Sequence, residues 1–335
     1  MEVRLRLRLR RDTRRPGVKR GRRVPEGDTI YRAARTLNRA LAGDVVTRFE
    51  SVFPALTRID VDHPLASRTI EGVAANGKHL LMRFSGDLVL RTHMRMNGSW
   101  HIYRPGERWQ RPRRDMRILV ATERFEAVGF NIPVAEFFIL RPLRPDARGV
   151  EPAAERWRNE ASLSEAPEGT AAMPRRRAPS EDLRKMGPDL LGDSFDDAEA
   201  LRRFRERGET TIADALINQR VVAGAGNVYK SEVLFLCRMD PAAKVNDISD
   251  AQLRDIVATA RKLLRANVTD PKGGIVTYRG YRRTTRRGNP AEGLYVYGRA
   301  RKPCRRCGSA IRVQPQGPNA RLTYWCPTCQ SSGSR

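Results

Sequence analysis

Residues 24–29 read Val-Pro-Glu-Gly-Asp-Thr and stand between an arginine-rich leader and the first amphipathic segment of the chain. Two interpretations of Pro25 are open. Inside a longer chain, Pro25 is a tertiary amide with no N–H donor and no nucleophilic nitrogen. As the first residue of a mature chain, it is a secondary amine beside the carboxyl group of Glu26. Because valine codons sometimes initiate translation in bacteria, a start at Val24 followed by removal of the initiator methionine would free the proline nitrogen.

The segment that follows predicts a helix over residues 28–42. Asp28 is the predicted N-cap and Gly43 the predicted residue after the C-cap. The helix would place Pro25 and Glu26 just ahead of its N-terminus, where the positive end of the helix dipole favours an anionic ligand. The apolar residues recur at helical spacing, and they are Ile30, Ala33, Ala34, Leu37 and Leu41.

After this helix the apolar pattern changes to a period of two, which predicts short β-strands separated by turn residues. Many short strands after one helix indicate an α+β fold whose N-terminal domain is a β-sandwich with a packed helix. The predicted strands are 45–53, 69–75, 79–84, 88–94, 99–103, 115–121 and 125–130. Helical patterns return at 197–207, 211–219, 227–236 and 250–266.

Composition divides the chain into five parts. Residues 1–24 are a basic leader that we expect to be absent from the mature protein, although a basic arm that binds nucleic acid or membrane is the alternative. Residues 25–141 form the predicted N-terminal catalytic domain, and 142–180 a Pro-, Arg-, Glu- and Ala-rich linker. Residues 181–290 form a predicted helical domain that ends in a basic loop, and 291–335 a zinc finger.

The net charge of the 335-residue chain is +26, which is extreme for a solvated surface and indicates a polyanionic partner. Residues 1–23 hold eleven Lys and Arg against two acids, a charge of +9, so +17 remains without them. No apolar run approaches the ~18–20 residues of a membrane span, and the leader lacks the apolar core of a secretory signal. We expect no membrane partner and a cytoplasmic, nucleoid-associated protein.

Four of the five cysteines are arranged as Cys304-x2-Cys307-x18-Cys326-x2-Cys329. This spacing predicts one tetrahedral Zn²⁺ held on paired knuckles. Because four thiolates fill all four positions, the zinc is predicted to be structural rather than catalytic. The loop between the knuckles contains Arg321, which either holds a phosphate or is a solvated charge.

Residues 219–230 read Gln-Arg-Val-Val-Ala-Gly-Ala-Gly-Asn-Val-Tyr-Lys and join two predicted helices. The glycines permit a tight turn, and Asn227 is predicted to open the next helix with free backbone N–H groups. A Gly-x-Gly-Asn entry to a helix can cradle a phosphate. A simple helix–helix turn is the alternative and is the more common meaning of such a sequence.

Two further candidate sites lie in the strand-rich part of the chain. Lys78 opens a strand in Gly-Lys-His, and an isolated lysine of this kind is usually a surface residue. Residues 93–98 read His-Met-Arg-Met-Asn-Gly at the end of an apolar strand. An exposed methionine at such a turn would make a wedge between stacked bases, whereas a buried one would be core.

Together these motifs resemble the formamidopyrimidine-DNA glycosylase and endonuclease VIII family of base-excision repair enzymes. The resemblance runs from Pro25 to Gln330, and its opening Pro-Glu-Gly-Asp-Thr is similar to the endonuclease VIII branch, in an actinobacterial type of composition. The other motifs occur in the family's order: Gly-Lys-His-Leu, His-x-x-Met-x-Gly, Met-Gly-Pro-Asp-Leu-Leu (186–191), Gln-Arg-x-x-Ala-Gly-x-Gly-Asn, Val-Tyr-Gly-Arg (296–299) and the Cys-Pro-Thr-Cys-Gln of the finger.

The resemblance implies a helix-two-turn-helix motif in the C-terminal helical domain and a bifunctional glycosylase and AP lyase that removes oxidised bases, pyrimidines above all. The nitrogen of Pro25 would attack C1′ of the damaged nucleoside, and Glu26 would protonate the sugar ring oxygen before β,δ-elimination. Lys78, Asn227 and Arg321 would grip phosphates of the damaged DNA. The void left by the extruded nucleotide would be filled by Arg95, Met96 and Asn97.

The chain departs from the family pattern in three places. Asn218 replaces the usual aspartate before the turn motif, the void-filling triplet is unusual, and the linker is long. If residues 1–24 persist, Pro25 has no amine, so the alternative is a catalytically silent lesion-binding or DNA-binding zinc protein. A generic zinc-ribbon protein ranks last because it leaves Pro25 to Lys78 unexplained. We expect a monomer, since the enzyme must straddle one duplex.

Overall fold

The computed structural model describes residues 25–139, 183, 185–269, 275–278, 280 and 290–331. The predicted leader (1–24), the linker (142–180) and most of the basic loop (271–290) lie outside these residues. Within the described part of the chain, no helix is long and apolar enough to cross a membrane.

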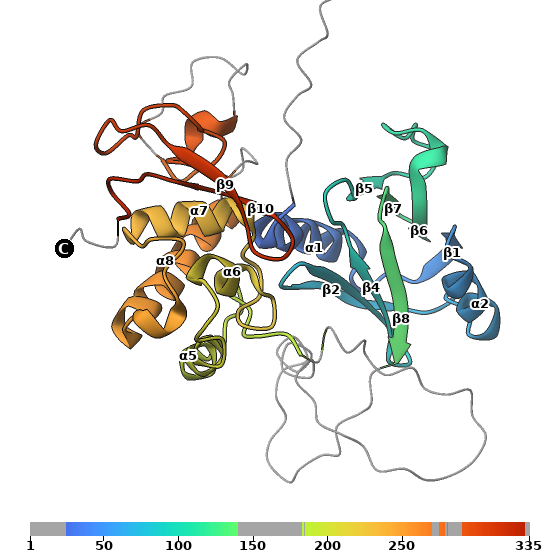
Figure 1. Ribbon diagram of the computed structural model, residues 1–335. Coiled ribbons are helices and arrows are strands. Elements are labelled where there is room, and N and C mark those ends of the chain that lie inside the picture. Colours follow the sequence, from blue (N-terminus) through green and yellow to red (C-terminus); the bar gives the residue numbers. More distant parts are fainter. Residues whose placement is uncertain are drawn as a thin grey trace, which may run out of the picture.

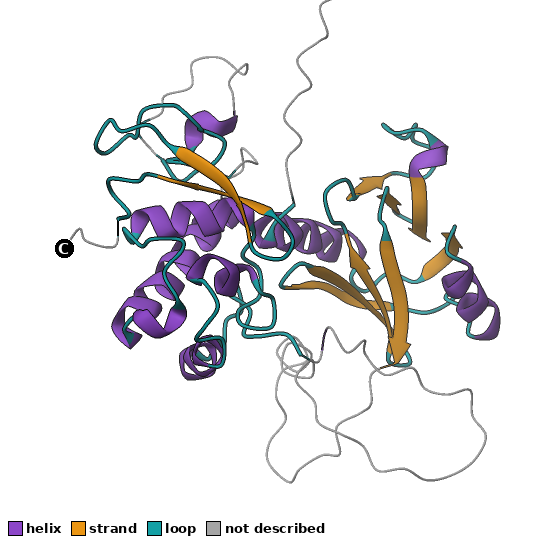
Figure 2. Cartoon of the chain, viewed as in Figure 1, coloured by secondary structure: helices purple, strands orange, loops and turns teal. Residues whose placement is uncertain are grey.

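The N-terminal half is a sandwich of two antiparallel four-stranded sheets (Figures 1 and 2). The first has the order β1-β6-β7-β5 and contains β1 (Val46–Ser51), β6 (Met116–Thr122), β7 (Glu126–Phe130) and β5 (Ser99–Tyr103). The second has the order β2-β3-β4-β8 and contains β2 (Ile70–Asn76), β3 (His79–Phe84), β4 (Leu88–His93) and β8 (Val134–Ile139). Side chains from both sheets, such as Val120 and Leu90, form one buried core, and the expected β-sandwich is confirmed.

Helix α1 (Gly27–Leu41) packs on this core through the predicted apolar stripe. Gly43 has a φ of +88°, as expected for a glycine just past the helix. The prediction that Asp28 is the N-cap was wrong. The N-cap is Glu26, while Asp28 lies inside the first turn, fully buried, and pairs with Arg32 at 2.9 Å.

Two elements of the sandwich were not predicted. Helix α2 (Pro54–Asp62) buries only Leu56, so it has no apolar stripe that a pattern would reveal. Strand β8 pairs with β4 and follows Pro133 directly, where the sequence indicated no further strand. The seven predicted strands are all present, with ends that differ by a few residues.

The C-terminal half is helical around its own apolar core. Its helices are α5 (Asp197–Arg205), α6 (Ile212–Ile217), α7 (Asn227–Leu236) and α8 (Asp250–Thr269). Three short 3-10 helices span Arg113–Asp115 in the sandwich, and Val245–Asp247 and Pro290–Gly293 in this half. The finger hairpin, β9 (Arg312–Gln316) and β10 (Arg321–Trp325), lies against α7 (Figure 1).

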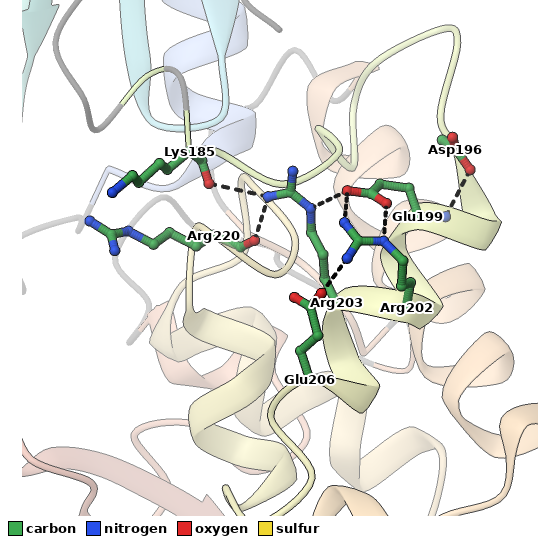
Figure 3. Close-up of polar contacts among 7 residues, drawn as sticks. All are labelled: Lys185, Asp196, Glu199, Arg202, Arg203, Glu206 and Arg220. Carbon is green, nitrogen blue, oxygen red and sulfur yellow. Dashed lines mark hydrogen bonds and ion pairs between the residues drawn. The ribbon is translucent and has the colours of Figure 1, made fainter. Parts of the chain in front are cut away.

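Arg203 of α5 ties this helix to the two segments that frame the glycine-rich turn (Figure 3). Its guanidinium donates to the backbone carbonyls of Lys185 and Arg220, at 3.2 and 2.8 Å, and pairs with Glu199 at 2.5 Å. Charge-assisted hydrogen bonds to carbonyl oxygens fix backbone geometry. We infer that Arg203 holds the start of the turn beside the segment at Lys185.

Candidate active site and nucleic-acid interface

The carboxylate of Glu26 joins the two halves of the molecule. It is 1% exposed and accepts hydrogen bonds from the backbone N–H groups of Val228, at 2.9 Å, and Tyr229, at 3.4 Å. Those groups belong to the first turn of α7, whose N-cap is Gly226. An acid from the start of the sandwich therefore completes the N-terminus of a helix 200 residues away, where free N–H groups favour an anion.

The two glycines of the turn motif have different reasons, and only that of Gly226 is the contact with Glu26. Gly224 has a φ of +107°, and its carbonyl accepts from the backbone N–H of Gly27 at 3.0 Å. A Cβ on Gly226 would lie 2.4 Å from Cδ of Glu26, inside the contact distance of two carbons. The Gly-x-Gly-Asn turn thus serves as the seat of the Glu26 carboxyl group, in addition to opening α7 at Asn227.

The pKa of the Glu26 carboxyl group is raised above its ordinary value, chiefly because burial removes the charged form from water. The positive charge of Lys78 and the two backbone N–H donors oppose this effect without cancelling it. A carboxyl group whose pKa is raised holds its proton to higher pH than an ordinary glutamate, which suits it to act as a proton donor. Pro25, directly before it, is half-buried.

Lys78 is brought to Glu26 by the tight turn between β2 and β3. Gly77 has a φ of +56°, and its N–H donates to the Asp189 carboxylate at 2.8 Å. The N–H of Leu191 donates to the same carboxylate at 2.9 Å, so the 186–191 motif anchors this turn to the helical half. Burial lowers the pKa of the half-buried Lys78 to about 8, despite the opposing charge of Glu26.

The finger hairpin supplies the other cation, Arg321, at the start of β10 and exposed. Its charge lowers the pKa of Lys78, so the two cations lie within electrostatic range of each other. Among the described residues, the buried Oδ1 atom of Asn227 has no hydrogen-bond partner. The three residues predicted to grip phosphates come from the β2–β3 turn, the start of α7 and the start of β10. Lys78 interacts electrostatically with Glu26 and Arg321, and Asn227 directly precedes Val228, whose N–H donates to Glu26.

The turn between β4 and β5 presents Arg95, Met96 and Asn97, all three exposed. The two methionines differ: Met94 is buried in the sandwich core, whereas Met96 is 56% exposed, as the wedge interpretation requires. The turn is shaped by Arg95, whose φ is +45° and whose N–H donates to Nδ1 of His93 at 3.0 Å. A Cβ on Gly98 would lie 2.6 Å from the carbonyl oxygen of Met94, which explains the glycine there.

Asn218, the departure from the family pattern, ends α6 and holds the turn by its side chain. Its Oδ1 accepts from the N–H of Arg220 at 3.0 Å. Asn and Asp both present an oxygen for this local hydrogen bond. Asparagine therefore preserves the turn with one negative charge less.

The four cysteines of the finger form one cluster, and their Sγ atoms all lie within 4.8 Å of one another. The Cys304–Cys329 and Cys307–Cys326 sulfur pairs are 4.0 and 3.4 Å apart. Four thiolates at ~2.3 Å around one zinc ion would stand about 3.8 Å apart. The donor set and its spacing fit a tetrahedral structural Zn²⁺, which would fix the hairpin that carries Arg321.

Sequence reasoning missed two residues of this site. Lys230, on the first turn of α7, is fully buried, although a helical lysine is normally on the surface. Tyr297 is half-buried, and burial, with a smaller contribution from the negative charge of Glu26, raises the pKa of its phenol to about 12. Tyr297 lay in a quoted motif, but no pattern marked Lys230.

Comparison with known proteins agrees with this architecture. Residues 24–131 match the family model for the formamidopyrimidine-DNA glycosylase N-terminal domain, and residues 186–279 match the formamidopyrimidine-DNA glycosylase H2TH domain. A probable endonuclease 8 2 of Streptomyces coelicolor is 38% identical over 92% of this chain and 94% of its own. A DNA-(apurinic or apyrimidinic site) lyase Nei2 of Mycolicibacterium smegmatis is 31% identical over 92% and 100%.

Among solved structures, the formamidopyrimidine-DNA glycosylase of Lactococcus lactis, non-covalently bound to DNA that contains an AP site, has a TM-score of 0.66. It is 20% identical and covers 92% of this chain and 100% of that one, a likeness of fold. The two family models and the closely matched length of the relatives lead to one conclusion. The chain belongs to the formamidopyrimidine-DNA glycosylase and endonuclease VIII family of DNA-repair glycosylases.

Proposed function

We propose that this protein is a bifunctional DNA glycosylase and AP lyase of base-excision repair that acts as a monomer on oxidised bases, pyrimidines above all. The observation that carries the proposal is the Glu26 carboxyl group. It is buried beside Pro25, seated on the first turn of α7, and its pKa is raised. The arrangement supplies a proton donor next to a nitrogen that is nucleophilic when Pro25 is the first residue.

The first step is attack by the secondary amine of Pro25 on C1′ of the damaged nucleoside. A bond forms between the proline nitrogen and C1′, and the bond from C1′ to the base breaks, so that the base leaves with a proton. An α-amine titrates near ~8, whereas lysine titrates near ~10.4, so a useful fraction of the amine is unprotonated at neutral pH. Chain synthesis from Val24 and loss of the initiator residue would supply this amine.

Glu26 then protonates the ring oxygen as the sugar opens, which leaves an iminium ion between Pro25 and C1′. β-Elimination breaks the C3′–oxygen bond and δ-elimination breaks the C5′–oxygen bond, with Glu26 returning protons. Hydrolysis of the iminium linkage frees the amine. The raised pKa of Glu26 supports this role, because the group must hold a proton when the substrate binds.

The cations around Glu26 support a grip on the DNA backbone. Lys78 and Arg321 would neutralise phosphates at the lesion, and Asn227 would donate a side-chain N–H to one of them. The exposed turn of Arg95, Met96 and Asn97 would enter the base stack after the damaged nucleotide is extruded. The cysteine-bound zinc would hold the finger in position and take no part in the chemistry.

The names of two relatives support the same activity. The mycobacterial relative is named as an AP-site lyase, and the Streptomyces relative as an endonuclease 8. The Pro-Glu-Gly-Asp-Thr opening supports the pyrimidine preference. The two sheets and the separate helical core support a proposed division into a catalytic domain at 25–141, a linker at 142–180, a helical domain at 181–290 and a zinc finger at 291–335.

The test is borohydride trapping on duplex DNA that carries an abasic site. We expect a covalent protein–DNA adduct, and we expect Pro25→Gly to weaken it or move it to another amine. Intact-mass measurement of the native protein should give a chain that begins at Pro25. A native chain in which Pro25 is internal, with no trapped adduct and salt-sensitive binding to lesion DNA, would instead identify a catalytically silent DNA-binding zinc protein.

A further inference from the structure

Lys230 is a buried cation with no acceptor. Its side chain is 0% exposed, and its Nζ atom has no hydrogen-bond partner among the described residues. Its backbone N–H donates to the carbonyl of Gly226 at 2.8 Å as part of α7. Because an unpaired ammonium group is costly to remove from water, such a lysine is kept where a ligand completes its environment.

The surroundings of Lys230 are those of the proposed phosphate grip. Lys230 follows Asn227 by three positions on α7, so their side chains lie on the same face of the helix. That face meets β10, because the N–H of Tyr324 donates to Oγ of Ser231 at 3.3 Å. Thr323, next to Tyr324, is fully buried, and its Oγ1 is also without a partner.

Three charged groups act on the Lys230 ammonium. Asp214 of α6 and Glu26 attract the proton, and Arg321 of β10 repels it. Neither acid pairs directly with Lys230, since Asp214 accepts from Oγ1 of Thr211 at 2.9 Å and Glu26 accepts from α7 backbone groups. Burial outweighs both acids and lowers the pKa of Lys230 to about 8.

Two neighbouring cations repel each other until an anion binds between or beside them, and the repulsion is stronger when one of them, like Lys230, is buried. Arg321 lowers the pKa of both Lys78 and Lys230, so its guanidinium is the group the two lysines have in common. The hydroxyl of Thr323, which can donate to an anion and has no partner among the described residues, lies on β10 two positions after Arg321. Together these groups form a site whose positive charge is not balanced, and whose donors are not satisfied, by the described part of the protein.

We propose that Lys230 is a positioning residue of the phosphate grip: a buried positive charge behind Asn227 and Arg321 that strengthens the hold on the phosphodiester next to the damaged nucleotide. The proposal rests on the proposed function for its ligand class, a DNA phosphate. Lys230 acts through the low-dielectric interior, where salt screens its field much less than it screens a surface charge.

The experiment measures binding of a duplex that carries a tetrahydrofuran abasic analogue, which cannot form the covalent intermediate. We expect Lys230→Met to raise the Kd about tenfold at pH 6.5, the size of one lost charged interaction. Lys244→Met is the matched control, because Lys244 is 55% exposed and pairs with Glu209 on the surface at 2.7 Å. We expect that control to change the Kd less than twofold, roughly the effect of an exposed charge.

The pH dependence separates a charge effect from a packing effect. The ratio of the Lys230→Met Kd to the wild-type Kd should fall toward one between pH 8 and 9.5, because wild-type Lys230 then loses its proton in the free protein. Lys230→Arg should restore most of the affinity at pH 6.5 and keep it at pH 9.5. A Lys230→Met protein with normal zinc content and unfolding temperature that binds DNA like the Lys244→Met control overturns the proposal.

If Lys230→Met does not fold, ¹³C-lysine NMR of the wild-type protein gives the answer. The proposal expects two lysine resonances that titrate near 8 in the free protein, Lys78 and Lys230, to move to higher pKa when the abasic duplex is added. If only one of them moves, the proposal is overturned. Absence of a borohydride adduct in protein that still binds DNA through Lys230 would contradict the proposed chemistry and leave this inference standing.

Discussion

The acidic side and the cationic side of the site are completed in different ways. The carboxylates of Glu26 and Asp189 each accept hydrogen bonds from two backbone N–H groups. The donors to Glu26 lie in the first turn of α7, and those to Asp189 lie in the β2–β3 turn and in the 186–191 motif. On the other side, Nζ of Lys230 and Oγ1 of Thr323, which can both donate to an anion, have no hydrogen-bond partner among the described residues. The acids are therefore positioned by the protein itself, whereas the cationic side is finished only by a bound anion.

This difference divides the site into a part that is built for proton transfer and a part that is built for binding. Groups held by backbone hydrogen bonds keep their geometry before the substrate arrives, which favours chemistry. Groups without partners gain most when the ligand binds, which favours affinity. Mutations on the two sides should consequently affect different measured quantities.

The largest effect is expected from Glu26→Gln. The amide can fill the same seat on α7 but cannot transfer a proton, so single-turnover cleavage of a duplex with an oxidised pyrimidine should fall about 10²–10⁴-fold while binding is retained. Glu209→Gln, which removes an exposed carboxylate that pairs with Lys244 on the surface, is the control and should cleave at the wild-type rate. Equal rates for the two variants would contradict the proposed role of Glu26.

The next largest effect is expected from a change in Gly226, which lies against the Glu26 carboxyl group. Gly226→Ala places a Cβ where Cδ of Glu26 now lies 2.4 Å away, so the carboxyl group must shift. We expect cleavage to fall about 10²-fold, the effect of a displacement near 1 Å. Gly293→Ala is the control, because its Cβ would meet only ordinary contacts at 3.6 Å or more. Unchanged cleavage by Gly226→Ala would show that the seat is not needed.

These two predictions also show how far the sequence alone could reach. The motifs predicted that Pro25, Glu26 and Asn227 matter, and the apolar stripe predicted α1, because local pattern and burial agree there. The seat could not be predicted, since it depends on a contact between residues 26 and 226 that no local spacing encodes. For the same reason Asp28 resembled a cap although it is buried against Arg32.

The cationic side was harder to predict because its buried residue, Lys230, is of a type that is normally exposed. Lysine in a helix usually extends into water, so the sequence of α7 does not indicate that Lys230 is buried. Helix α2 and strand β8 were missed for a simpler reason, namely one buried residue in the former and a preceding proline in the latter. In each case the deciding information is tertiary.

A smaller effect is expected in the pH profile. The Pro25 amine must lose a proton near ~8 to attack, while Lys78 must keep its proton to bind phosphate and has a pKa of about 8. We expect kcat/KM to give a narrow bell centred near pH 8, because this parameter reports groups of the free enzyme. In Lys78→Arg the alkaline limb should move to higher pH. A profile that is flat from pH 7 to 10 would contradict the assignment.

The smallest effect concerns the stability of the DNA-free protein. The pKa of Lys230 is about 8 when folded and 10.5 when unfolded, so the unfolded state binds more protons between these values. Stability should therefore rise as pH increases from 8 toward 10.5, in contrast to the loss expected for a paired lysine. Thermal unfolding should show this rise in the wild-type protein and a smaller one in Lys230→Met. An equal rise in both would mean that Lys230 is not the source.

The most direct measurement is the position of the covalent bond in the borohydride-trapped complex. After digestion of protein and DNA, mass spectrometry should find the reduced sugar remnant on a peptide whose first residue is Pro25, attached to its nitrogen. A remnant on a lysine side chain, or a peptide in which Arg23 and Val24 still precede Pro25, would contradict the central claim that Pro25 beside Glu26 is the nucleophile.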